Sequence, residues 1–248
     1  MFRHIASLFC WLYHKWLYCV LFVLLFSLNA CSSLFISPQG EVTYARGVQI
    51  LHSSLPHSKV QVELAQKTLK YDTLVFYISA QIAQQSPKNA PQQSSNFVLS
   101  TQCVQAFFEN TPLKIFTYED LLHQYFDFIG ILQDFNIPTP TPRIDTQTVF
   151  NVMPFYYMPN PGVLYYAPIY SPFFTLDPAN VAYSQERRGA LKVFLINYLR
   201  ESTLSLESGA QGGFIALSKS RIKNSGTLEL EVHIQEDIHR FYFDIHTK

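Results

Sequence analysis

The segment from Leu228 to His246 holds the densest group of side chains that could do chemistry. His233, His239 and His246 are of the residue type that most often binds transition metals in proteins. Apolar and polar residues alternate over 228–234 and again over 239–246, which predicts two strands. This alternation places His239 on the core face and the other two histidines on the outer face, so the three rings cannot converge on one ion. Cys-x-x-Cys and His-Glu-x-x-His spacings are absent from the sequence, and we predict no metal and no cofactor.

The same two strands suggest a pair of carboxylates. If Glu236-Asp237 is a two-residue turn, Ile234 faces His239 and Glu229 faces Asp244, with Glu231 one pair along. Two neighbouring carboxylates can perform acid–base hydrolysis, although on an open strand face they are more typical of a solvated surface. The sequence has no Gly-x-Ser-x-Gly, no Ser-x-x-Lys and no glycine-rich phosphate loop. We therefore predict no catalytic residue, with a hydrolase site assembled from residues distant in sequence as the alternative.

A stretch rich in tyrosine and proline provides the candidate binding residues. Nine of the fourteen prolines lie between 138 and 178, and proline at this density blocks helix and central strand, which predicts an extended loop. Tyrosine offers a large, rigid contact area, so this loop is either a contact surface for a protein or glycan, or a cover for a sheet edge. The candidate binding residues are Tyr156, Tyr157, Tyr165, Tyr166 and Tyr170.

The N-terminal residues indicate where the chain resides. An uncharged apolar run covers residues 16–28, after a short basic start with Arg3 and Lys15, and it ends at Leu28-Asn29-Ala30-Cys31. The run has the length of a signal peptide and is shorter than the roughly 20 residues that span a bilayer. Residues 1–31 resemble the export signal of bacterial lipoproteins. Asn29 departs from that pattern, which normally has a small or apolar residue there.

The resemblance implies a lipid anchor. Cys31 would be lipidated and residues 1–30 removed, so the partner of the mature N-terminus would be membrane lipid, held stably by three acyl chains. Ser32 resembles the class sorted to the outer membrane, with the folded domain in the periplasm or at the cell surface. Two alternatives stay open. One is an uncleaved single-pass anchor in the inner membrane, from residue 16 to about residue 36, and the other is simple secretion.

Composition narrows the classes of function. The chain of 248 residues has 18 basic and 18 acidic side chains, so nothing indicates binding to nucleic acid. Two of the four cysteines lie within residues 1–30, and Cys31 is the predicted lipid acceptor. Cys103 then remains alone, which excludes an intramolecular disulfide and predicts a thiol packed in the core.

Hydrophobic periodicity predicts the elements of the mature chain. Residues 31–57 are predicted to be a tether, because short apolar runs are mixed there with Ser, Pro and Gly. A capping pattern at Thr117 starts a predicted helix that reaches about Phe135, and a second helix covers 184–200. The alternating segments predict strands over 59–65, 72–82, 97–108, 113–116 and 212–217, with 212–217 beside the C-terminal hairpin.

Together these elements predict a mainly β protein with two α-helices. We expect an antiparallel immunoglobulin-like β-sandwich, formed by a single domain over 58–248 with a helical and Tyr/Pro-rich insertion at about 117–201. The predicted function is that of a membrane-anchored lipoprotein with a structural or protein-interaction role at the cell envelope and an envelope protein as partner. The alternatives are an envelope hydrolase and a glycan- or peptide-binding module that uses the Tyr/Pro-rich loop.

Overall fold

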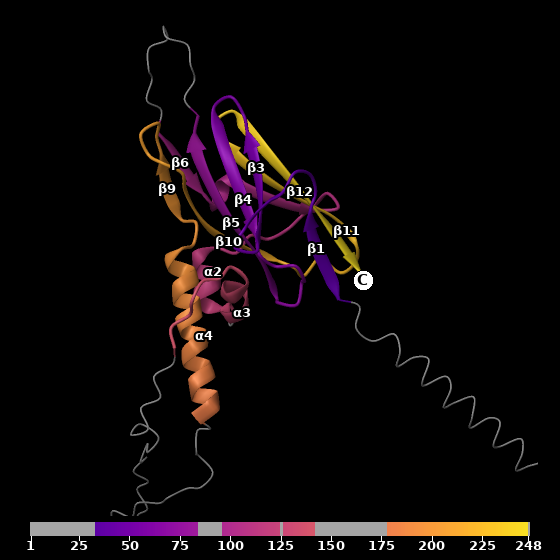
Figure 1. The fold of residues 1–248 in the computed structure, drawn as a ribbon, viewed down its shortest axis with the longest axis vertical. Coiled ribbons are helices and arrows are strands. Elements are labelled where there is room, and N and C mark those ends of the chain that lie inside the picture. Colours follow the sequence, from indigo (N-terminus) through magenta and orange to yellow (C-terminus); the bar gives the residue numbers. More distant parts are fainter. Residues whose placement is uncertain (1–32, 84–95, 125, 142–177, 248) are drawn as a thin grey trace, which may run out of the picture.

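The fold is mainly β, with antiparallel sheets and few helices (Figure 1). The structure is a computed structural model that describes residues 33–83, 96–124, 126–141 and 178–247. The predicted signal, Cys31 and the Tyr/Pro-rich segment with its five candidate tyrosines lie outside the described residues. The predictions made for them therefore stay predictions.

Two five-stranded sheets carry most of the chain. The first has the strand order β1-β12-β11-β7-β8, and the second has the order β10-β5-β4-β3-β2. The strands of the first sheet are β1 (Leu34–Pro38), β7 (Val104–Phe108), β8 (Thr111–Pro112), β11 (Gly226–Ile234) and β12 (Asp237–Thr247). Those of the second sheet are β2 (Thr43–Ala45), β3 (Val48–Ser54), β4 (Ser58–Leu64), β5 (Thr73–Ile82) and β10 (Gln211–Ser218).

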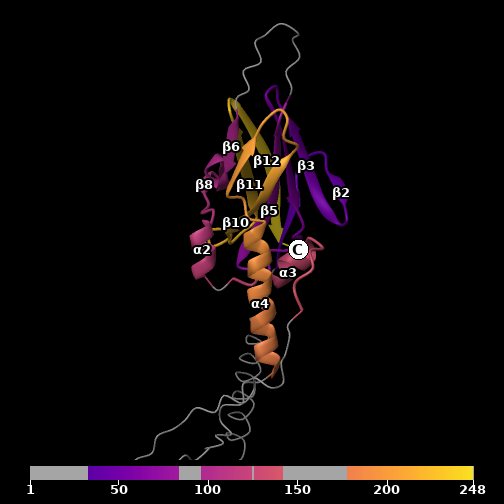
Figure 2. The ribbon, with the colours of Figure 1, turned by 90° about the vertical axis from the view of Figure 1, so that its left-hand side faces the viewer.

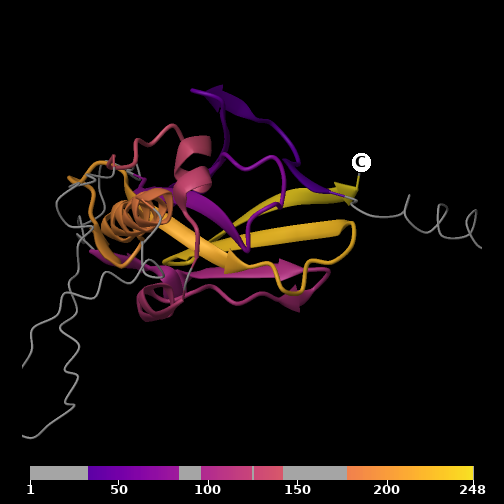
Figure 3. The same cartoon turned by 90° about the horizontal axis from the view of Figure 1, so that it is seen from below.

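The remaining elements form a ribbon and a helical layer. The two-stranded ribbon pairs β6 (Phe97–Ser100) with β9 (Glu201–Leu204), and a 3-10 turn, η1 (Thr101–Cys103), leads from β6 into β7. The helices are α2 (Tyr118–His123), α3 (Ile129–Asp134) and α4 (Pro178–Ile196). Figure 3 shows the helices gathered on one side of the strands, and Figure 2 shows the N-terminal part of α4 extending beyond the sheets.

The inner faces of the two sheets share one hydrophobic core. Phe76 of β5 packs against Phe243 of β12 with 4.9 Å between ring centroids, and both are fully buried. The alternation of β5 explains its place between two layers, because Leu74, Phe76 and Ile78 face the first sheet. Val75, on the opposite face of β5, packs against the helices. The predicted strand over 72–82 is confirmed as β5.

A second core, largely aromatic, joins the second sheet to the helices. Phe194 of α4 stacks on Phe128 at 4.1 Å and on Phe214 of β10 at 5.3 Å. Phe135 meets the edge of the Phe214 ring at 5.1 Å. Because burial of apolar surface contributes about 25 cal/mol per Å², these large rings help to attach the helices to the sheet.

The helices differ from the prediction in one respect. Thr117 caps α2 as predicted, with a capping box in which Thr117 and Asp120 each accept a hydrogen bond from the other's backbone amide. The predicted single helix to Phe135 is instead two short helices, because Gln124 has extended dihedrals. The second predicted helix is confirmed as α4, although it ends at Ile196 and residue 198 forms a bridge to β10.

The predicted tether over 31–57 is wrong for most of its described length. Residues 34–54 form β1, β2 and β3, which belong to both sheets, so the folded body begins at Leu34 instead of residue 58. Ile36 and Leu51 are buried in the core between the sheets. These strands are short and separated by Gly40 and Gly47, both at positive φ, which gave the segment its loop-like composition.

The C-terminal hairpin has the predicted faces and a different register. Ile234 pairs with Asp237, Val232 with His239 and Leu230 with Phe241, so the turn residues are Gln235 and Glu236 instead of Glu236 and Asp237. Gln235 has a φ of 53°, which suits a tight hairpin turn. The shift equals two residues and keeps each apolar side chain on the core face. The predicted strand at 212–217 also exists, but it pairs with β5 in the second sheet instead of with β11.

Candidate functional site

A buried polar network lies where β3 and β4 of the second sheet meet β12 of the first. It consists of Ser53 near the end of β3, Ser58 at the start of β4, and Asp237 and His239 at the start of β12. The side chains of Ser58 and His239 are fully buried, and Asp237 is 7 % exposed. The prediction that His239 faces the core is confirmed, while sequence analysis missed its three polar partners.

The hydrogen bonds of this network have one consistent direction. Ser58 Oγ donates to Asp237 Oδ2 at 2.7 Å and must therefore accept from His239 Nε2, which lies 2.8 Å away. With its proton on Nε2, a neutral His239 accepts at Nδ1 from Ser53 Oγ at 2.8 Å. The amide of His57 also donates to Asp237 Oδ2 at 2.9 Å.

The charge states follow from the surroundings of the two titratable groups. Burial by itself would raise the pKa of Asp237, but the hydrogen bonds from Ser58 Oγ and the His57 amide outweigh it, and the net pKa lies below that of an ordinary aspartate. Burial lowers the pKa of His239, and the charge of Asp237 counteracts this only in part. The network therefore contains an aspartate anion and a neutral imidazole at pH 7.

The residue types of this network are those of a catalytic triad, but the connections are different. In a triad the imidazole accepts the serine proton, and the carboxylate orients the other side of the imidazole. Here the serine proton points at Asp237, and the far nitrogen of His239 is held by Ser53. Ser58 is also closed off from substrate by its complete burial. The geometry is that of a polar connection between the two sheets.

The outer face of the C-terminal hairpin carries ion pairs. Arg240 Nε lies 2.7 Å from Glu231 Oε1 and 3.4 Å from Glu229 Oε1. The hydrogen bond from Arg240 and that from His233 lower the pKa of Glu231 despite its partial burial. The predicted pairing of Glu229 with Asp244 is wrong, because the register places Tyr242 opposite Glu229. The carboxylates thus flank a guanidinium and lack the geometry of an acid–base pair.

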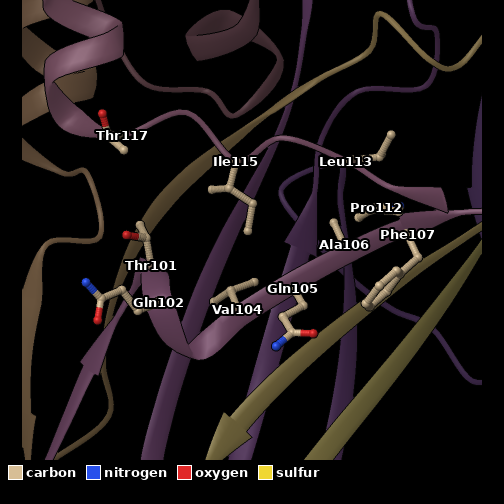
Figure 4. A pocket seen from close by; sticks show the side chains of 10 residues that line it. All are labelled: Thr101, Gln102, Val104, Gln105, Ala106, Phe107, Pro112, Leu113, Ile115 and Thr117. Atoms are coloured by element: carbon tan, nitrogen blue, oxygen red, sulfur yellow. The ribbon is translucent and has the colours of Figure 1, made fainter.

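A groove of 380 Å³ runs along one edge of the first sheet (Figure 4). One wall is η1 with β7, and the other is the segment 112–117 that leads to α2. None of its lining residues is charged. They are Thr101, Gln102, Val104, Gln105, Ala106, Phe107, Pro112, Leu113, Ile115 and Thr117.

The groove exists because two segments separate after a tight hairpin. Glu109 and Asn110 connect β7 to β8 with φ values of 47° and 61°. The pairing with β7 continues as far as Leu113, whose amide donates to Ala106 O at 2.8 Å. The chain then crosses to the second sheet, where Ile115 forms a bridge with Leu217 of β10.

This separation leaves part of the β7 backbone open. The Glu109 amide donates to Thr227 O of β11, so odd-numbered residues of this strand direct their backbone groups to β11 and even-numbered ones to the groove. Within the described part of the chain, the amide of Ala106 and the carbonyl of Val104 have no hydrogen-bond partner. Both residues are at most 4 % exposed, and buried backbone groups without partners are rare in folded proteins.

Cys103 lies beside the groove and at the margin of the core. It is a free cysteine of intermediate exposure that packs against the core between the sheets. Its Sγ donates to the Val98 carbonyl at 3.5 Å. The predicted core position is therefore only partly realised.

Three further observations bear on function. The described residues contain no group of three or more His, Cys, Asp or Glu side chains that could hold a metal ion. No helix in the ranges that the structure covers is both long and apolar enough to cross a membrane. Searches with family models, curated proteins and solved structures find no match to this chain.

Proposed function

We propose that the chain is a lipid-anchored protein of the bacterial cell envelope with a structural or protein-interaction role and no catalytic activity. The anchor is supported by the apolar run that ends at Ala30-Cys31. The interaction role is supported chiefly by one observation, the uncharged groove at the open edge of β7. On this proposal the domain is held at the outer membrane and faces the periplasm or the cell surface. An inner-membrane single-pass anchor is the alternative location.

We also propose that the fold belongs to the immunoglobulin-like β-sandwiches. Two five-stranded antiparallel sheets with a common core support the sandwich arrangement. The connections from β2 to β5 are consecutive hairpins, a meander, whereas immunoglobulin domains use Greek-key connections. The proposed kinship therefore concerns the layers and not the order of the strands.

The anchor is tested by substituting its lipid acceptor. In cells fed a radioactive fatty acid, the wild-type chain should take up label and lose residues 1–30. The Cys31→Ser variant should stay unlabelled and accumulate as precursor. A Cys103→Ser variant is the control and should mature normally. Normal maturation and membrane association of Cys31→Ser would refute the lipid anchor.

The interaction role is tested by crosslinking in living cells. A photoreactive residue replaces either Gln105, in the groove, or Tyr44, which is 69 % exposed on β2 in the other sheet. We expect the same envelope protein to be captured repeatedly from position 105 and not from position 44. Equal capture from both positions, or none from either, would argue against a specific partner at the groove.

A further inference from the structure

We infer that the groove binds an extended, uncharged polypeptide segment of a partner protein, which adds as a short strand to the edge of β7. This inference rests on the proposed interaction role and specifies its partner. It is carried by the backbone groups that face the groove and by the neutrality of the walls.

The open backbone of β7 requires a partner with alternating donors and acceptors. The amide of Ala106 and the carbonyl of Val104 both point into the groove and have no partner among the described residues. An extended peptide offers a carbonyl and an amide at this spacing, which is the basis of strand addition. A sugar or an apolar small molecule has no such regular spacing.

The walls favour a segment without charge. Besides the backbone groups, the groove offers the apolar faces of Val104, Leu113 and Ile115 and the amides of Gln102 and Gln105. Burying an unpaired charge against these walls would be strongly unfavourable.

Charged side chains near the groove are engaged by other groups: Arg221 donates to the carbonyl of Pro112 at 2.8 Å, and two further cations form ion pairs. Lys114 Nζ lies 2.9 Å from Asp120 Oδ1, and Arg240 binds Glu231, the residue that pairs with Gln105 across the ladder. We therefore expect the bound segment to be uncharged, with small apolar or hydroxyl side chains.

The open stretch sets the length of the added strand. At one end the Leu113 amide already occupies the carbonyl of Ala106. At the other end the amide of Val104 donates to Thr101 O within η1. The segment bound directly is thus about three residues long, or about 10 Å at the usual rise per residue.

Two other long edges of the sheets are covered by the chain itself. Along β1, the Ile36 amide donates to Lys67 O and the Leu69 amide donates to Leu34 O. Along β10, segments 114–116 and 197–199 provide hydrogen bonds to Ala216 and Phe214. Covering edges in this way prevents unwanted pairing. The edge of β7 therefore differs from the edges of β1 and β10, because part of its backbone is left without a covering segment.

The inference is tested with the full chain, labelled with ¹⁵N and held in detergent micelles. The probe is acetyl-Thr-Val-Thr-Val-Thr-amide, and the control probe is the same peptide methylated at every backbone nitrogen. We expect the first peptide to shift the Ala106 amide resonance and to slow its hydrogen exchange at least tenfold at saturation. The methylated peptide should do neither, because it cannot donate to the carbonyl of Val104 and its N-methyl groups prevent the close approach that would bring a peptide carbonyl to the Ala106 amide.

Three variants locate the binding site. Ala106→Pro removes the groove-facing amide without removing a bond to β11, and Ile115→Arg places bulk and charge in the groove. Each should weaken binding at least tenfold at unchanged circular dichroism. Val98→Arg makes a similar change at a residue that is 50 % exposed and does not line the groove, and it should leave binding unaltered.

Several results would overturn the inference. These are an unperturbed Ala106 resonance at millimolar peptide, equal binding of the methylated peptide, and a shift that depends on protein concentration without peptide. The last result would identify a second copy of this chain as the occupant. If the crosslinked partner is still captured by Ala106→Pro and Ile115→Arg, strand addition fails while the proposed function stands. If no partner is captured from the wild type, the proposed function fails by itself.

Discussion

Removing the Ser58 hydroxyl should weaken the connection between the two sheets. In Ser58→Ala, the Asp237 carboxylate loses its 2.7 Å hydrogen bond and keeps the one from the His57 amide. His239 Nε2, buried and 2.8 Å from the missing oxygen, loses its acceptor. The substitution thus affects two groups at once, although it deletes a single atom.

The expected magnitude follows from these two losses. A hydrogen bond to a charged group contributes about 1.5–3 kcal/mol, and a buried donor left without a partner costs about 1–3 kcal/mol. Because the two effects share one site, we expect the free energy of unfolding to fall by about 3–5 kcal/mol. This is a large part of the roughly 5–15 kcal/mol that keeps a typical domain folded.

The measurement is urea unfolding of the purified protein, followed by far-ultraviolet circular dichroism. Ser53→Ala should cost less, about 1 kcal/mol, because it removes one neutral hydrogen bond at a partly exposed residue. Ser79→Ala on β5 is the control, since Ser79 makes no side-chain hydrogen bond to the described residues. A loss for Ser58→Ala no larger than that for Ser79→Ala would refute the network as a structural connection.

Three further predictions concern stability. Folding lowers the pKa of His239, so the unfolded chain binds the imidazole proton at a higher pH than the folded chain does. As the pH falls from about 6.5, the free energy of unfolding should therefore decrease, by at most about 1.4 kcal/mol per pH unit for this group. The lowered pKa of Asp237 adds a further loss below about pH 4, and His239→Gln should flatten only the first part of the curve, as measured by urea unfolding at each pH. Gly213→Ala should lower the thermal midpoint by the equivalent of about 1–3 kcal/mol, because its Cβ would lie 2.7 Å from the Leu199 nitrogen; an unchanged midpoint would show that the two backbones can separate freely. Thr117→Ala removes one half of the capping box and should cost about 0.5–2 kcal/mol in urea, whereas Thr117→Ser should restore most of it.

Hydrophobic periodicity predicted which residues of each strand face the core, but not which residues pair across a hairpin. Alternation identified the faces of β4, β5, β11 and β12, because burial on one face of a strand demands it. Alternation has a period of two, however, and a hairpin shifted by two residues buries the same side chains. The true register depends on the turn, where Gln235 has a positive φ. Glutamine gives no sequence signal for this conformation, unlike glycine or asparagine.

Two other differences have their own physical causes. Residues 34–54 were misjudged because strands of three to seven residues between glycine turns contain too few alternating positions to be recognised. The partner of residues 212–217 was missed because sheet membership depends on contacts far apart in sequence.

The candidate sites were largely hidden from the sequence. The core-facing position of His239 was a usable signal, since a buried imidazole needs polar partners. Nothing in the sequence pointed to Ser53 and Ser58 as those partners, because they come from another sheet about 180 residues away. The groove carries no sequence motif, because its unpaired hydrogen-bonding groups belong to the backbone of Val104 and Ala106 and any residue type could supply them.

The groove and the closure of the second sheet have the same origin. A single segment can form a hydrogen-bond ladder with one strand edge at a time. Residues 114–116 pair with β10 and cover the edge of the second sheet, through bonds such as that from the Phe116 amide to Ala216 O at 2.9 Å. They are thereby withdrawn from β7, whose ladder stops at Leu113. The opening in β7 is therefore a consequence of how the two sheets are joined, because the segment that would have continued the β7 ladder covers the edge of β10 instead.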